Sequence, residues 1–507
     1  MTVRRIMGLE TEYGISVPGD PMANPMFLSG QVVSAYAAAH GIRSTQSSWD
    51  YAFEDPLRDA RGWQLGRAEA DPSQLTDVED PTLANVVLPN GARYYVDHAH
   101  PEYSSPEVTS PRDAIVWDRA GDAIALESVR LLAERPGQAP VNLYKNNADG
   151  KGQSYGTHEN YLMPRRTPFG DIVRHLIPFF VTRQVICGAG RVGLGVDSRT
   201  PGYQVSQRAD FFETEVGLET TLKRPIINTR DEPHAVADLY RRLHVIIGDA
   251  NQLDVATLLK LGTTSLVLGM IETGHLREDW SVRRPVAALQ AVSHDPGLET
   301  TIELVDGRRV RALDLQWMYH DAARAWLDDR ADDPTPDATE EVMTVWADVL
   351  TRLGTNVMSC AADLDWVAKL QLLEGYRSRD GLAWDDHRLA AIDIQWADVR
   401  PEKGLVHRLR DRGRTRELVT REAVRTAQSL PPEDTRAWFR GRCIDRFGQS
   451  VFSASWDSVV FDVPGQSSLQ RVPISDPERG TRQQVGELLD RSTDVEALLQ
   501  GLASPTG

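Results

Sequence analysis

The N-terminal segment of the chain alternates strictly between two kinds of side chain, and this restricts what it can form. It reads Gly8-Leu9-Glu10-Thr11-Glu12-Tyr13-Gly14-Ile15. As a β-strand it carries Glu10 and Glu12 on one face and its larger, mainly apolar side chains on the other. Two carboxylates on one face repel each other and cost desolvation unless a positive charge lies between them. Two interpretations stay open: an edge strand with glutamates in solvent, or a pair that holds Mg²⁺ shared with nucleotide phosphates.

The length of the chain predicts more than one domain. Its 507 residues are too many for one compact core, and its 25% of charged residues is typical of a soluble globular protein. The net charge of −17 argues against general nucleic-acid binding. An acidic partner would therefore need a local basic groove.

Cysteine usage and hydropathy bear on the cellular compartment. The 3 cysteines are widely scattered, which excludes a disulfide framework and a four-cysteine zinc site and suits a reducing cytoplasm. No apolar run approaches the length of a membrane span, and none follows Arg4-Arg5 as it would in a signal peptide. We therefore expect a cytoplasmic protein without a membrane segment.

A second group of acidic residues follows a predicted hairpin. Pro89-Asn90-Gly91 is a turn signal, and Ala92–Asp97 reads as the return strand, with Tyr95 and Asp97 on one face. Glu102 lies a few residues further on. Asp97, the last residue of this strand, is either a catalytic carboxylate or an ordinary strand-end residue. The histidines that follow, His98 and His100, lack a third zinc ligand at suitable spacing.

A third polar strand is predicted in the middle of the chain. Val141–Tyr144 and Gly156–Leu162 read as a strand pair, and His158 and Asn160 share a face of the second strand. An imidazole and an amide in this position could serve a metal and a nucleotide, or could form an ordinary hydrogen-bonded polar pair.

A helix is predicted over Leu239–Ile247, with Arg242 and His244 opposite its apolar stripe. Arginine binds phosphate and carboxylate through its planar guanidinium group, although a single arginine is more often a surface residue. Upstream, a helix is predicted over Val32–His40, and residues 43–80 then lose all periodicity. A segment of this length is either a functional lid or a disordered insertion.

Helices are predicted for most of the remaining chain, up to about residue 429. A smaller C-terminal unit, residues 430–507, begins where the composition shifts at Leu430-Pro431-Pro432, and it ends in an amphipathic helix near Gln483–Leu499. Trp456 in this unit is either a core residue, which its residue type favours, or a stacking platform. The other predicted helices are Pro111–Glu134, Val255–Ile271, Leu313–Leu327, Glu340–Leu353, Leu364–Tyr376 and His387–Trp396.

Taken in order, these motifs resemble a known superfamily. An E-x-E strand, a second acidic strand, a G-T-H-E-N strand and a late tryptophan resemble the carboxylate–amine ligases typified by glutamine synthetase. Within that superfamily, five blocks are similar to the bacterial pupylation enzymes, which comprise the Pup ligase and its amide-hydrolysing relative. The blocks are Met7–Gly14, Tyr155–Tyr161, Thr229–His234, Arg242–Asn251 and Asp365–Leu370.

The resemblance implies an α+β fold, in which a glutamine synthetase-like antiparallel sheet forms a cradle packed with helices over residues 1–429, followed by a small domain over 430–507. It also implies ATP and Mg²⁺ as cofactors. The implied magnesium ligands are Glu10, Tyr95, Glu102, His158 and His244. The implied ATP contacts are Gly8, Leu9, Glu10, Thr11, Glu12, Ser104, Ser105, Asn160, Arg242 and, more weakly, Trp456. Asp97 becomes the catalytic carboxylate, and Arg208 and Arg230 are implied to contact the γ-phosphate or the substrate carboxylates.

Residues 43–80 favour the amide-hydrolysing branch, because the ligase branch has only a short connection at this point. Enzymes of that branch hydrolyse the side-chain amide of the C-terminal glutamine of the small protein Pup, or the isopeptide bond between Pup and a lysine. ATP need not be consumed in this reaction. Asp97 would act as nucleophile or as general base. The implied partners are Pup, pupylated proteins and, through a functional link, the proteasomal ATPase ring. The alternatives are Pup ligation with ATP cleavage, and a Pup-binding module without catalysis.

Overall fold

The centre of the protein is an antiparallel β-sheet. The computed structural model describes residues 3–43, 56–70, 84–150, 152–330 and 337–503. Within these residues six strands form one sheet in the order β14-β9-β1-β7-β6-β5, and every neighbouring pair is antiparallel. The strands are β1 (Met7–Glu12), β5 (Asn85–Val87), β6 (Arg93–Asp97), β7 (His100–Ser104), β9 (Thr157–Pro164) and β14 (Tyr240–Val245). The predicted α+β class and antiparallel cradle are confirmed.

The alternation of β1 separates a polar face of this sheet from a buried one. Met7 and Leu9 belong to the main hydrophobic core, whereas Glu10 and Glu12 project from the opposite face. The register brings Glu10 opposite His158 on one side and opposite Ser104 on the other. Polar side chains of neighbouring strands therefore meet on one face, as the period of two predicts.

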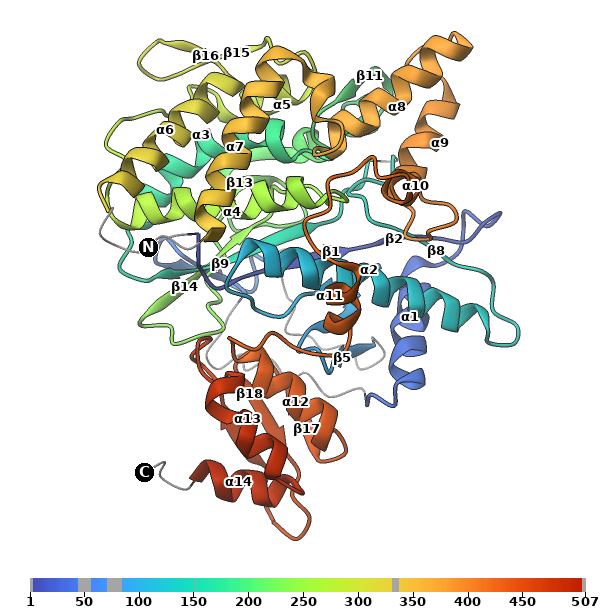
Figure 1. Ribbon diagram of the computed structural model, residues 1–507, viewed down its shortest axis with the longest axis vertical. Coiled ribbons are helices and arrows are strands. Elements are labelled where there is room, and N and C mark those ends of the chain that lie inside the picture. Colours follow the sequence, from blue (N-terminus) through green and yellow to red (C-terminus); the bar gives the residue numbers. More distant parts are fainter. Residues whose placement is uncertain (1–2, 44–55, 71–83, 151, 331–336, 504–507) are drawn as a thin grey trace.

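Helices cover the apolar face of the sheet. Three long helices pack there, and further helices form an outer layer behind them (Figure 1). The inner helices are α2 (Pro111–Ala133), α3 (Phe169–Cys187) and α4 (Asp254–Glu272). The outer helices are α5 (Pro285–Ser293), α6 (Ala312–Asp328), α7 (Asp337–Thr355) and α8 (Asp365–Asp380).

Helix α4 is a long helix of the core that is buried along nearly its whole length. By length and composition alone this 19-residue helix is long and apolar enough to cross a membrane, contrary to the expectation from the sequence that no run approaches such a length. All side chains of its apolar window are buried within the protein. The helix thus lies at the centre of the helical layer.

A C-terminal unit packs below the sheet in Figure 1 and has its own hydrophobic cluster. It consists of α12 (Ala437–Phe447), β17 (Val451–Ala454), β18 (Ser458–Phe461), β19 (Gln470–Pro473), α13 (Arg482–Arg491) and α14 (Val495–Ala503). Gly91, in the β5–β6 turn, has φ of 80° and lies so close to α12 that an added Cβ would be 2.9 Å from the carbonyl oxygen of Ala437. Glycine is therefore required at this position, because of both its positive φ and the close approach of α12. The division into domains at residue 430 stays a prediction.

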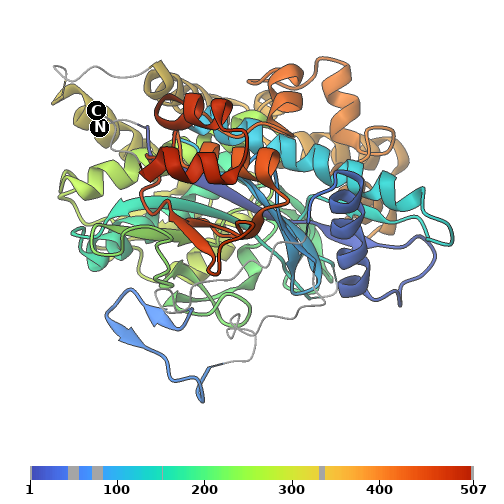
Figure 2. The ribbon, with the colours of Figure 1, turned by 90° about the horizontal axis from the view of Figure 1, so that it is seen from below.

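Smaller elements surround these layers, and Figure 2 shows them from below. The strands are β2 (Gly14–Ser16), β3 (Arg58–Asp59), β4 (Trp63–Gln64), β8 (Asn142–Tyr144), β10 (Arg191–Leu194), β11 (Thr200–Gln204), β12 (Phe212–Gly217), β13 (Arg224–Asn228), β15 (Thr301–Glu303) and β16 (Arg309–Arg311). The helices are α1 (Pro25–Ala39), α9 (His387–Trp396), α10 (Leu405–Asp411) and α11 (Arg421–Ala427).

Three sequence-based predictions of elements are wrong. The predicted helix over Leu239–Ile247 is the edge strand β14, because pairing with β9 satisfies its backbone and buries alternate side chains. The predicted pairing of Val141–Tyr144 with Gly156–Leu162 does not occur, since β8 pairs with β2 instead. The predicted C-terminal helix is two helices, α13 and α14, separated at Ser492-Thr493-Asp494.

Candidate active site

Acidic side chains from three adjacent strands converge on the polar face of the sheet. Glu10 and Glu12 come from β1, Asp97 from β6 and Glu102 from β7. Glu12 stands opposite Glu102, which in turn stands opposite Tyr95. The Tyr95 hydroxyl donates to Glu102 Oε1 at 2.5 Å. The structure thus brings together all four predicted carboxylates.

Two groups of side chains have the composition of metal sites. In the part of the chain that the structure describes, each group has three ligand atoms within 4.8 Å of one another. The histidine cluster is Glu10, His158 and His244, and the carboxylate cluster is Glu12, Asp97 and Glu102. The first mixes imidazole nitrogen with oxygen, and the second offers only the carboxylate oxygens that Mg²⁺ prefers.

The carboxylate cluster carries more negative charge than its neighbours neutralise. Burial, together with the negative charges of Asp97, Glu10 and Glu12, raises the pKa of Glu102 well above its ordinary value. Uncompensated carboxylates in a buried position are the environment that a divalent cation stabilises. The donor set and its charge therefore fit Mg²⁺.

The pKa values of the neighbouring glutamates of β1 are lowered, in contrast to that of Glu102. Burial disfavours ionised Glu10, but the contact with His158 at 3.3 Å and the charge of Arg242 outweigh it and hold the pKa of Glu10 well below its usual range. Burial also disfavours ionised Glu12, yet its histidine contacts and the backbone N–H of Gly156 lower its pKa to about 2. Both groups are carboxylates at neutral pH and are available as ligands.

Asn160 connects the histidine cluster to an arginine. Its Nδ2 donates to Glu10 Oε1 at 2.9 Å, and its Oδ1 accepts from Arg242 Nη1 at 2.8 Å. Arg242 Nη2 also donates to Glu232 Oε2 at 3.2 Å. Burial and the charge of Arg242 lower the pKa of His244 well below its ordinary value. His244 is therefore neutral, the form in which imidazole binds metals.

A pocket lies beside the histidine cluster, between the sheet and the C-terminal unit. Among the predicted ATP contacts it is lined by Gly8, Leu9, Glu10, Ser104, Ser105, Asn160, Arg242 and Trp456. The backbone N–H of Leu9 donates to Ser105 Oγ at 2.9 Å, which holds the strand at the pocket wall. Two predicted ATP contacts do not line this pocket. The side chain of Thr11 lies on the opposite face of the sheet and donates to Asp118 Oδ1, and Glu12 belongs to the carboxylate cluster.

Two charged residues of this pocket were not predicted from the sequence. Glu107 follows β7, and Arg436 precedes α12; Arg436 Nε donates to Glu107 Oε1 at 2.6 Å. Arg440, one helical turn further, donates to Glu107 Oε2 at 2.5 Å and lies 4.8 Å from the ring centroid of Trp456. The i, i+4 spacing of the two arginines was the one signal available, since it puts both on one face of a helix.

The predicted phosphate or substrate arginines lie towards the β13–β14 side of the site. Arg208 is 1% exposed and donates to Ser154 Oγ at 3.2 Å and to the carbonyl oxygen of Ile246. Burial and the nearby charge of Arg224 lower the pKa of Arg208 to about 9. Arg230 is 3.8 Å from Glu232, and its buried Nε has no hydrogen-bond partner within the described chain. An unsatisfied buried guanidinium nitrogen fits an anionic ligand.

Asp97 lies at the end of β6, where the chain turns towards β7. His98 in this turn has φ of 52°, and its Nδ1 is 3.1 Å from Asp97 Oδ1. This contact with Asp97 raises the pKa of His98 to about 9. The carboxylate is thus partly exposed and paired with an imidazolium at neutral pH.

Part of the predicted lid, residues 43–80, is described and lies against the arginine side of the site. The backbone N–H of Ala60 donates to Thr229 O at 2.8 Å, and that of Asp231 donates to Arg58 O at 3.1 Å. Asp59, 2% exposed, accepts from Thr229 Oγ1 at 2.6 Å and from the guanidinium of Arg61. Residues 44–55 and 71–80 of the predicted lid lie outside the described residues.

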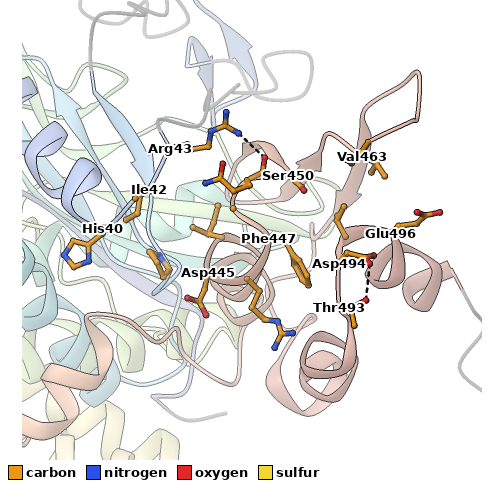
Figure 3. Close-up of a pocket in the computed structure, with 18 residues that line it drawn as sticks. His40, Ile42, Arg43, Asp445, Phe447, Ser450, Val463, Thr493, Asp494 and Glu496 are labelled. Atoms are coloured by element: carbon orange, nitrogen blue, oxygen red, sulfur yellow. Dashed lines mark hydrogen bonds between the residues drawn. The ribbon is translucent and has the colours of Figure 1, made fainter.

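A separate cavity of about 520 Å³ lies between the end of α1 and the C-terminal unit (Figure 3). His40 and Arg43 approach it from one side, and Asp445 and Asp494 from the other. None of the predicted site residues lines it. The larger opening is therefore distinct from the candidate active site.

The fold and the site together define a class of protein. An antiparallel sheet carries clustered carboxylates and histidines on its polar face and a pocket at one side, an arrangement that suits an enzyme that binds metal ions and a nucleotide. Residues 5–460 match the family described as Pup-ligase protein. The chain belongs to the Pup-ligase family.

Relatives with assigned names cover the whole chain. A protein named Depupylase from Acidothermus cellulolyticus is 60% identical over 502 residues, 98% of this chain and 100% of the relative. A protein named Pup deamidase/depupylase from Mycolicibacterium smegmatis is 54% identical over 503 residues, 99% of this chain and 100% of the relative. Both names belong to the amide-hydrolysing branch.

Solved structures of the ligase branch share the fold. The complex between Prokaryotic Ubiquitin-like Protein Pup and its ligase PafA has a TM-score of 0.80 and 31% identity, and covers 100% of this chain and 96% of that chain. The Pup ligase PafA in complex with ADP has a TM-score of 0.71 and 34% identity, and covers 80% of this chain and 89% of that chain. The identity to these ligases is well below that to the depupylases.

Proposed function

We propose that this protein is an amide hydrolase that acts on Pup. It deamidates the C-terminal glutamine of Pup to glutamate, and it cleaves the isopeptide bond between Pup and a lysine of a pupylated protein. The single observation that carries this proposal is the 60% identity to a depupylase over 98% of the chain. The clustered carboxylates on the sheet supply a site of matching chemistry.

ATP and Mg²⁺ are the proposed cofactors. The ADP complex of a 34% identical ligase supports a nucleotide in the pocket beside the histidine cluster. Glu10, His158 and His244 would hold one metal ion, and Glu12 and Glu102 with Tyr95 a second, which leaves Asp97 for the reaction. When bound, nucleotide and Mg²⁺ would polarise the substrate carbonyl and stabilise developing negative charge. Because amide hydrolysis is downhill, the nucleotide need not be consumed.

Asp97 is the proposed catalytic carboxylate. As a nucleophile it attacks the carbonyl carbon of the side-chain amide and the carbon–nitrogen bond breaks. The departing nitrogen takes a proton from water and leaves as ammonia or as the lysine amine. Water then hydrolyses the resulting anhydride, which releases glutamate and restores the Asp97 carboxylate. As a general base, Asp97 would instead take a proton from the attacking water. Its side chain is partly exposed, and its Oδ1 lies 3.1 Å from Nδ1 of His98.

Substrate binding is assigned to the arginine side of the site. Arg230, with its unsatisfied Nε, and Arg208 would pair with the substrate carboxylates or the γ-phosphate. The three buried free cysteines support a reducing, cytoplasmic location.

The decisive experiment combines purified protein, MgATP and Pup ending in glutamine, followed by intact-mass spectrometry. We expect the mass gain of amide-to-acid conversion, and its loss in Asp97→Ala. Asp385→Ala, which removes an aspartate far along the chain from the sheet, serves as the matched control and should retain activity. Conjugation of glutamate-ended Pup to lysine with release of ADP would instead identify a ligase.

A further inference from the structure

Two arginines without an acidic partner meet shortly before strand β9 begins, and we name them the arginine pair. Arg208 Nε donates to Ser154 Oγ at 3.2 Å, and Arg224 Nη2 donates to the carbonyl oxygen of Ser154 at 2.7 Å. Both guanidinium groups therefore contact one residue. Their other acceptors are the carbonyl oxygens of Ile246 and Thr220.

The positive charge of the arginine pair is not neutralised within the part of the chain that the structure describes. Nη2 of Arg208 and Nη1 of Arg224 donate to none of the described residues. Burial lowers the pKa of Arg224 below its ordinary value, and the more distant charges of Glu12 and Glu213 offset this only in part. Two like charges in a buried position are costly, and a carboxylate on their free N–H groups would relieve that cost.

The arginine pair lies at the end of the sheet that carries Asp97. Strands β1 and β6 end there, and β7 and β9 begin there, because neighbouring strands are antiparallel. Gly156, two residues after Ser154, donates its backbone N–H to Glu12 Oε1 at 2.7 Å. Glu12 and Asp97 belong to the same carboxylate cluster. The arginine pair therefore adjoins the proposed site of reaction.

The pocket proposed for the nucleotide lies at the other end of the same sheet. Met7 and Gly8 line it at the start of β1, and Ser104 and Ser105 line it at the end of β7. A nucleotide therefore reaches the carboxylate cluster from one end of the sheet, and the arginine pair faces that cluster from the other end. An anion bound by the arginine pair is better supplied by the substrate than by the nucleotide.

The proposed substrates share one anionic group close to the reacting carbonyl. The side chain of the terminal Pup residue carries the amide or isopeptide bond, so the α-carboxylate of that residue stays free in both reactions. We propose that the arginine pair binds this α-carboxylate, and that Arg224 thereby selects a C-terminal residue over a glutamine within a chain. This inference rests on the proposed function. The planar guanidinium group suits the task, because it binds both oxygens of a carboxylate.

The test compares Pup ending in glutamine with the same Pup whose α-carboxylate is replaced by a carboxamide. Fragment-ion mass spectrometry shows which amide is hydrolysed. For the wild-type protein we expect side-chain deamidation with kcat/KM about thirtyfold higher for the free carboxylate. In Arg224→Gln this ratio should fall to about threefold, through loss on the free carboxylate alone, and Arg224→Lys should restore part of it. Arg199→Gln, which removes an exposed arginine, is the control and should keep the wild-type ratio.

Other outcomes overturn the inference. Equal kcat/KM of the wild-type protein for the two substrates would show that the α-carboxylate is not recognised, and an unchanged ratio in Arg224→Gln would remove Arg224 from its recognition. An equal fall on both substrates would mean that Arg224 supports the fold or, if calorimetric titration also shows weaker ATP binding, that the arginine pair binds a nucleotide phosphate. If the wild-type protein hydrolyses neither substrate, the proposed function itself fails, which is distinct from hydrolysis without discrimination.

Discussion

Glu107 illustrates how one buried carboxylate makes stability depend on pH. Burial opposes its ionisation, but Arg440 and Arg436 outweigh it and lower the pKa of Glu107 from 4.5 to about 2. Because the folded-state pKa is depressed, this stabilisation is present above the unfolded-state pKa and is lost as pH falls from about 4.5 towards 2. The shift corresponds to on the order of 3 kcal/mol at neutral pH.

We therefore expect the free energy of unfolding to fall between pH 5 and pH 3, and to fall less in Glu107→Gln, which is already less stable at pH 6. Urea denaturation at each pH measures both. Glu213→Gln, at an exposed position, is the matched control. An identical pH slope in wild type and Glu107→Gln would contradict the assignment.

Glu102 offers a test of the metal proposal that does not depend on activity. Its repulsion from Glu10, Glu12 and Asp97 destabilises the metal-free protein. Glu102→Gln should therefore raise the stability of the metal-free protein by about 1–2 kcal/mol and reduce the stabilisation that Mg²⁺ gives. Thermal unfolding with Mg²⁺ and with a chelator measures both effects. A Mg²⁺-dependent rise equal to that of wild type would rule out Glu102 as a ligand.

At the scale of single residues, part of the candidate site could be predicted from the sequence. The period of two in Gly8–Ile15 was sufficient to predict that Glu10 and Glu12 share a face, because alternation is a local property of a strand. The pairing of Glu107 with Arg436 joins residues 329 positions apart, and no local pattern encodes it. Such pairs follow only from the packing of distant elements.

At the scale of secondary-structure elements, hydrogen bonds hold the β3–β4 hairpin against the segment Thr229–Asp231, which contains Arg230. Asp59 accepts hydrogen bonds from Thr229 and Arg61 in a buried position. Asp59→Ala should leave the Thr229 hydroxyl unpaired, cost about 1–3 kcal/mol locally and release the hairpin. Hydrogen exchange of residues 56–70 measures the release.

Asp306→Ala, which removes a turn aspartate that also contacts an arginine but is exposed, is the control for the hairpin variant. We expect faster exchange in Asp59→Ala over residues 56–70 and over Thr229–Asp231, to which the hairpin pairs. Exchange that matches the wild type would mean that the backbone pairing alone holds the hairpin.

Local sequence patterns are sufficient to predict some helices and strands of this protein but not others. Helix α2 was predicted within one residue at its start and end because Ser110 caps it and Pro111 occupies its first turn. Strand β14 was mistaken for a helix because Leu239, Leu243, Ile246 and Ile247 also fit a helical period. Its pairing with β9 is a tertiary interaction that the sequence pattern does not contain.

At the scale of the whole molecule, the pocket proposed for the nucleotide is built from both the sheet and the C-terminal unit. Gly8 and Ser105 line it from the sheet, and Arg436 and Trp456 from the C-terminal side. A ligand bound there would contact both parts, so its binding energy would also stabilise their association. Nucleotide affinity and the stability of the junction are thus expected to change together.

Two substitutions in the pocket separate nucleotide affinity from the stability of the junction between the sheet and the C-terminal unit. Trp456→Ala removes an aromatic ring that Arg440 orients at 4.8 Å, and we expect about tenfold weaker ATP binding. Arg436→Ala should weaken ATP binding and also destabilise the protein without nucleotide, because Glu107 would lose one of its two partners. Calorimetric titration with ATP and thermal unfolding without it measure the two effects. Trp63→Ala, at an exposed tryptophan of the β3–β4 hairpin, should change neither. If Trp456→Ala binds ATP as wild type does, the tryptophan does not stack on the nucleotide, and the other residues that line the pocket bind ATP without it.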